Sequence, residues 1–218
     1  MRTIPLRATE DHEQVEAPAT RRLVRLPDSN EVVVRALRAR EPAGAARLFD
    51  RYYPYVRRIL SRLLGPDPEI ADVVQEVFLA AINSIDRLRD PEALKTWMGQ
   101  IAVNRARKRL RQRTRQRLFD LFPADEPPTR MDPQIADPEV DEAVRATYRV
   151  LDAMPTEDRL VFALRFIDGC EIAEIAALYD SSVSTIKRRV SRAASRFTMR
   201  ARREPSLEDY LVRAPWIR

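Results

Sequence analysis

Apolar side chains recur at helical spacing along most of this chain, and almost no glycine interrupts them. The chain holds 4 Gly against 16 Pro in 218 residues, whereas the tight turns of a sheet protein require many glycines. Residues 42–64 show the pattern most clearly. One stripe of that segment carries Leu48, Phe49, Tyr52, Val56, Ile59, Leu60 and Leu63. The pattern predicts an all-α protein.

Proline and glycine divide the helical segments into two groups. Gly65 and Pro66 end the helix at 42–64, and further amphipathic segments follow at about 68–85 and from Leu94 onward. Residues 119–139 hold five prolines and several acidic residues without a helical period, which favours an extended acidic linker. We therefore expect a flexible leader at 1–29, a helix bundle at 30–118, the linker at 119–139, a second helical domain at 140–203 and a C-terminal tail at 204–218.

Within the second domain, a helix is expected at 157–168, with Gly169 as its C-terminal cap. Two short helices joined by a tight turn are expected to follow it. Ile172 and Ile175 face a core on the first helix, a polar break follows at 180–182, and Ile186 and Val190 face a core on the second. Short polar side chains begin the second helix and long cations follow them. Base edges suit the short groups and phosphates suit the cations, so the pattern predicts a DNA-binding helix-turn-helix.

Positive charge is concentrated in two blocks. The formal net charge is +6, but residues 104–117 and 181–203 contain no acidic residue at all. A basic stretch on an isolated helix is more often a solvated face than a binding surface. The turn that precedes the second block favours phosphate binding there, and both blocks are candidate nucleic-acid surfaces.

Several classes of function are not supported by the residue types present. The single histidine, His12, and the single cysteine, Cys170, exclude the usual zinc ligand sets and an intrachain disulfide. The chain has no glycine-rich phosphate loop and no nucleophile elbow. It also lacks an apolar run of the roughly 18 residues that span a bilayer. We expect a cytoplasmic protein that is not an enzyme, uses no metal or cofactor and does not insert into membranes.

Three motifs in a fixed order carry a resemblance to a known family. Asp72 to Phe78 reads DVVQEVF, Trp97 to Asn104 reads WMGQIAVN, and the third motif extends from Glu174 to Ala193. Together they resemble the extracytoplasmic-function (ECF) group of the sigma-70 family, transcription initiation factors that carry RNA polymerase to promoters. The resemblance covers about residues 40–118 and 140–200. It implies a sigma2-type bundle followed by a sigma4-type helix-turn-helix.

The resemblance also implies partners and site residues. The partners would be the clamp helices of the largest polymerase subunit, the flap of the second subunit, promoter DNA and an anti-sigma factor. Residues implied for core-polymerase binding are Asp72, Gln75, Glu76 and Phe78. Residues implied for minus-ten DNA binding are Trp97, Asn104, Arg105, Lys108, Arg109 and Arg111. Residues implied for minus-thirty-five DNA binding are Ser182, Ser184, Thr185, Lys187, Arg188, Arg189 and Arg192.

Other interpretations stay open at this point. Trp97 and Phe78 are more typical of core aromatics than of contact residues, and Glu76 is also compatible with a solvated helix face. Asp180 stands where the turn of the helix-turn-helix usually has glycine, and it is expected to adopt the left-handed conformation. A one-component helix-turn-helix regulator is the alternative function. It would bind operator DNA without polymerase.

Overall fold

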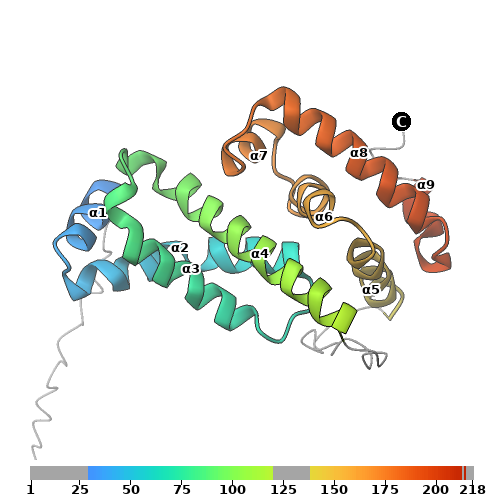
Figure 1. Ribbon diagram of the computed structural model, residues 1–218, viewed down its shortest axis with the longest axis horizontal. Coiled ribbons are helices and arrows are strands. Elements are labelled where there is room, and N and C mark those ends of the chain that lie inside the picture. The colour runs from blue at the N-terminus through green and yellow to red at the C-terminus, as the bar shows by residue number, and fades with distance from the viewer. Residues whose placement is uncertain (1–28, 120–137, 213, 215–218) are drawn as a thin grey trace, which may run out of the picture.

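The structure is a computed structural model that describes residues 29–119, 138–212 and 214 (Figure 1). The regular elements in these ranges are helices, which confirms the predicted all-α class. The α-helices are α1 Asn30–Arg38, α2 Pro42–Leu64, α3 Ile70–Ser84, α4 Leu94–Phe119, α5 Pro138–Asp152, α6 Thr156–Phe162, α7 Ile172–Leu178, α8 Val183–Ala201 and α9 Glu208–Val212. Short helical turns are η1 Ile85–Arg87, η2 Pro91–Ala93, η3 Ala163–Ile167 and η4 Pro205–Leu207. The leader and linker predicted from sequence fall almost entirely outside the described residues.

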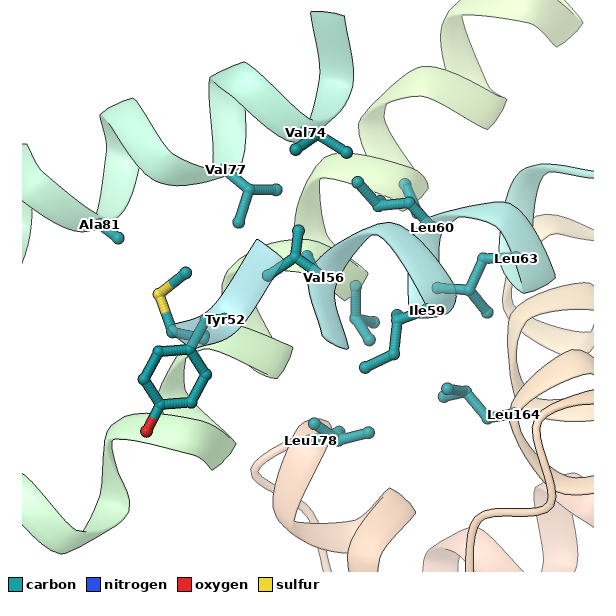
Figure 2. Close-up of a cluster of buried hydrophobic side chains, with 14 of the residues drawn as sticks. Tyr52, Val56, Ile59, Leu60, Leu63, Val74, Val77, Ala81, Leu164 and Leu178 are labelled. Carbon is teal, nitrogen blue, oxygen red and sulfur yellow. The ribbon is translucent and has the colours of Figure 1, made fainter. Parts of the chain in front are cut away.

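Helix α2 is the centre of the N-terminal helices. Pro42 begins it, at a position where the missing N–H removes no helical hydrogen bond. Val56 and Ile59 of α2 are fully buried, and α3 adds Val74 and Val77 to the same core (Figure 2). Each such side chain contributes about 1.5–3 kcal/mol on burial. No described helix is long and apolar enough to cross a membrane.

The C-terminal helices α5, α6 and α8 enclose a second core. The ring of Phe162 stacks on Phe197 with centroids 4.1 Å apart, and Leu207 of η4 covers the same cluster. The α-helix expected to continue to Asp168 changes into the π-helical turn η3, where the Asp168 N–H donates to the Ala163 carbonyl at 2.8 Å. Gly169 follows with a φ of 79°. This left-handed conformation confirms its expected position at a helix end.

The C-terminal helices pack directly on α2 and α4, an arrangement that the sequence analysis did not predict. Leu160, Leu164 and Leu178 are buried in the same core as the α2 side chains, and Figure 2 shows Leu164 and Leu178 beside Ile59. Figure 1 shows α6 between α4 and α8. The core of the N-terminal helices therefore extends into α6, η3 and α7, next to the second core around Phe162.

Side chains of the C-terminal helices also complete the end of α2. The last carbonyls of a helix have no partner within it. The Arg159 guanidinium donates to the carbonyls of Leu63 at 3.2 Å and Leu64 at 2.8 Å. The Tyr148 hydroxyl donates to the carbonyl of Arg62 at 3.2 Å. The closed arrangement, by which we mean this packing of α5–α7 on α2 and α4, is thus stabilised by hydrogen bonds as well as by apolar contacts.

Candidate nucleic-acid interface

The exposed side of α3 carries polar residues implied for polymerase binding. Asp72, Gln75 and Glu76 are exposed on one face of the helix. Leu79 follows one turn later on that face and is 52% exposed. Leu79 was not predicted as a site residue from sequence, although its spacing from Glu76 places it on the same face as the polar groups. Phe78 lies beside this face and not on it, and it is 5% exposed, so its ring supports α3 from within the core.

An exposed aromatic pair lies next to this helix. Phe49 and Tyr53 are 43% and 37% exposed, and their ring centroids are 4.8 Å apart. Phe49 also contacts Phe78, with centroids 4.9 Å apart. The placement of Phe49 on the buried stripe of α2 was wrong, because Leu48 and Tyr52 occupy that stripe and adjacent helical residues point about 100° apart. Exposed aromatic groups of this kind favour a partner-binding surface.

Helix α4 holds the residues implied for minus-ten DNA. Asn104 and Lys108 are exposed, and Asn104 accepts a hydrogen bond from Arg107. Arg105 lies 3.5 Å from the Glu76 carboxylate of α3. Trp97 is half-buried and packs against the core that contains the α2 side chains.

Arg109 of α4 is held by two carboxylates. Its guanidinium lies 3.4 Å from Asp67 and 2.7 Å from Glu69. The Asp67 side chain is fully buried and also pairs with Arg113. Burial would raise the pKa of Asp67, but the Glu69 N–H and the cations Arg113 and Arg109 outweigh it and hold that pKa below its ordinary value. Arg109 therefore attaches α4 to the segment between α2 and α3.

Replacing Asp67 by Asn is expected to lower the free energy of unfolding by about 1–3 kcal/mol, because two arginines lose a buried charged partner. The folded pKa of Asp67 is depressed, so its contribution is present above the unfolded value of about 4 and is lost as pH falls through the folded value. Urea unfolding at neutral and acidic pH should show a smaller acid-induced loss in D67N than in the wild type. Identical pH dependence would contradict this role. D86N is the control, since the exposed Arg40–Asp86 pair should contribute below about 1 kcal/mol.

The first turn of α8 is built as the helix-turn-helix prediction requires. Asp180 has a φ of 47°, which confirms the expected left-handed residue in the turn. The Ser182 side chain caps α8 by accepting from the Thr185 N–H at 3.2 Å. Side chains that lie open to solvent here are Ser184, Lys187 and Arg188. These groups are sterically available to a groove of duplex DNA.

The remaining implied cations of α8 are engaged within the protein. Arg192 lies 3.1 Å from Asp158 of α6, and Arg196 pairs with the same carboxylate, whose side chain is 2% exposed. The Arg189 guanidinium lies 5.9 Å from the centroid of the Tyr179 ring. Arg192 therefore anchors α8 on α6, although its side chain is 50% exposed.

Helix α4 faces the C-terminal helices with its basic side. Glu157 of α6 lies 2.8 Å from Arg107 and 3.1 Å from Arg111. The Gln100 side-chain amide donates to the Ala177 carbonyl of α7 at 2.8 Å. Arg107 was not singled out from sequence, because nothing distinguishes it from its neighbours within an unbroken basic block. Both candidate DNA-binding helices, α4 and α8, are thus attached to the first turn of α6.

Comparisons with known families match two separate parts of the chain. Residues 48–116 match the model of sigma-70 region 2, and residues 145–197 match the model of sigma-70 region 4. The ECF RNA polymerase sigma-E factor of Escherichia coli K12 is 30% identical over 173 residues, which cover 76% of this chain and 90% of that protein. The factor of the same name from Haemophilus influenzae is 30% identical over 154 residues, covering 67% of this chain and 81% of that protein.

Two solved structures share the fold. CnrH, solved in complex with the cytosolic domain of CnrY, superposes with a TM-score of 0.54 at 22% identity and covers 81% of this chain and 99% of its own. The sigma factor RpoE of Bartonella quintana, solved with the anti-sigma factor NepR, superposes with a TM-score of 0.53 at 21% identity. That match covers 72% of this chain and 95% of RpoE.

Proposed function

Because the chain belongs to the ECF group of the sigma-70 family, we propose that α3 docks on RNA polymerase core, α4 binds and opens the minus-ten element, and α8 reads the minus-thirty-five element. As a sigma factor, the protein directs promoter recognition and transcription initiation. We propose that it acts with the polymerase in the cytoplasm. The domain limits at 30–118 and 140–203 are part of the proposal.

The composition of the α3 face is the observation that carries the core-docking assignment. Asp72, Gln75 and Glu76 lie on the same face of α3 as Leu79, which is 52% exposed. Phe49 and Tyr53 extend the apolar part of this surface. Partner interfaces commonly combine an apolar centre with a polar rim, and carboxylates complement a basic partner. We assign Phe49, Tyr53 and Leu79 to the core-docking surface together with Asp72, Gln75 and Glu76.

The experiment combines purified full-length protein with bacterial core polymerase and genomic promoter fragments, and it maps transcript starts. The double variant Gln75→Ala plus Glu76→Ala is expected to bind core about tenfold to a hundredfold more weakly and to lose specific initiation. The matched control is Glu31→Ala plus Glu41→Ala, two exposed carboxylates near the ends of α1, which should initiate like the wild type. Specific DNA binding by the wild type without core-dependent initiation would contradict the proposal.

We propose that the C-terminal helices bind the flap of the second polymerase subunit. They contain an apolar pocket of about 360 Å³. Its lining includes Phe162, Phe166, Phe197, Leu207 and Leu211. A pocket with aromatic walls suits an apolar helix of a partner. We also propose that an anti-sigma factor binds this protein. The proposal is supported by RpoE of Bartonella quintana, which shares the fold and was solved in complex with an anti-sigma factor.

A further inference from the structure

Two successive carboxylates of α6 lie between the two candidate DNA-binding helices. Glu157 binds Arg107 and Arg111 of α4, whereas Asp158 binds two arginines of α8. Adjacent residues of a helix point about 100° apart, which lets one turn of α6 reach both neighbours. Each carboxylate binds a pair of arginines spaced by four residues, so each pair presents its cations on one helix face.

The two carboxylates differ in how easily they can be released. Asp158 is 2% exposed, and its arginines belong to α8, which packs on α6 within the same core. Glu157 is 34% exposed and its partner Arg111 is 57% exposed. The Glu157 contacts join the C-terminal helices to α4, and water can reach the groups when they part. Asp158 is thus a structural anchor, whereas the Glu157 carboxylate lies at the partly exposed contact between α6 and α4 and can leave its arginines for solvent without breaking an ion pair inside the C-terminal helices.

Arg107 and Arg111 have the chemistry of a phosphate site. One carboxylate oxygen of Glu157 accepts from both guanidinium groups, at 2.8 Å and 3.1 Å. A DNA phosphodiester offers an oxygen of the same charge and acceptor character, and arginine is well suited to bind it. The site lies in the block at 104–117, which has no acidic residue of its own.

We propose that Arg107 and Arg111 bind a phosphate of promoter DNA and that Glu157 occupies their site in the closed arrangement, as an intramolecular competitor. This rests on the proposed function, in which α4 is a DNA-binding helix. Tyr179, which directly follows α7, strengthens the competition, because Arg107 lies 5.2 Å and Arg189 lies 5.9 Å from its ring centroid. A movement of α6 and α7 away from α4 releases Arg107 from both the carboxylate and the ring, and it also separates Leu160 and Leu178 from the core that they share with α2. The apparent affinity of the protein for DNA then rises in proportion to the fraction of molecules in which this contact is open.

The test measures binding of the full-length protein, without polymerase, to a fluorescein-labelled DNA duplex that has a single-stranded overhang. Glu157→Gln is expected to bind this probe about threefold to tenfold more tightly than the wild type. Glu208→Gln is the matched control, because it removes one exposed carboxylate from the first turn of another short helix. It raises the net charge equally and should leave affinity nearly unchanged. Equal affinities of the two variants would overturn the proposal.

A second comparison tests whether the higher DNA affinity of Glu157→Gln depends on Arg107 and Arg111. In the Arg107→Gln plus Arg111→Gln background, Glu157→Gln should no longer raise affinity, since the effects of coupled residues are not additive. A gain that persists there would also overturn the proposal. Core-dependent initiation by the wild type is measured in parallel. Absence of initiation would reject the proposed function, whereas initiation with no effect of Glu157→Gln on DNA affinity would reject only the competition.

Discussion

Replacing Arg159 by Met is expected to lower the free energy of unfolding by about 3 kcal/mol. Arg159 is 3% exposed, and its guanidinium donates to the carbonyls of Leu63 and Leu64 at the end of α2. It also pairs with Asp152. Met retains an apolar stem of similar length, so the packing contribution changes little and the loss of the donors dominates.

Urea unfolding followed by circular dichroism measures this effect. Arg149→Met is the matched control on α5, because Arg149 also pairs with carboxylates, Glu142 and Glu204, but its side chain is 47% exposed. Exposed ion pairs contribute below about 1 kcal/mol, so the control should change stability little. A loss in Arg159→Met no larger than in the control would show that the end of α2 does not depend on Arg159.

Most helix limits could be predicted because local signals determine them. Pro42 and Gly65 bracket α2, and the structure begins and ends that helix at Pro42 and Leu64 as expected. The left-handed Asp180 and Gly169 were also identified from residue type and position. Such features depend on backbone preferences within a few residues, and these preferences are visible in sequence.

The polar contacts between helices could not be predicted in the same way. Lys108 and Arg109 are adjacent cations, yet Lys108 is exposed while Arg109 is held by Asp67 and Glu69. The difference arises from the orientation of α4 against the segment between α2 and α3. Glu157 and Arg107 are 50 residues apart in sequence. Their pairing depends on how the C-terminal helices dock, which no local pattern indicates.

The closed arrangement also depends on one backbone position. Gly65 has a φ of 71°, and a Cβ there would lie 2.4 Å from Cδ1 of Tyr148. The Tyr148 ring cannot move aside freely, because its hydroxyl donates to the carbonyl of Arg62 at 3.2 Å. Glycine is therefore required for two separable reasons. With a ψ of −154°, the Gly65 backbone lies in a region that essentially only glycine adopts, and the docked aromatic ring leaves no space for a side chain.

Gly65→Ala is expected to lower the free energy of unfolding by about 2–4 kcal/mol, the sum of backbone strain and displacement of the Tyr148 ring. Gly169→Ala is the matched control, because Gly169 has a φ of 79° and nothing lies within 4 Å of its added Cβ. Strain alone should cost that variant about 1–2 kcal/mol. Urea unfolding gives both values, and small-angle X-ray scattering should show a larger radius of gyration for Gly65→Ala only.

A double-mutant cycle with Tyr148→Ala separates the two costs. Once the ring is absent, Gly65→Ala should cost about 1–2 kcal/mol less than it does in the wild type, since only the backbone strain remains. An unchanged cost of Gly65→Ala in that background would mean that the ring does not oppose the added methyl group, and the assignment of Tyr148 as the docking group would fail. A reduced cost, with the scattering change confined to variants that disturb this contact, would establish that α5 is held against the end of α2 by the Tyr148 ring.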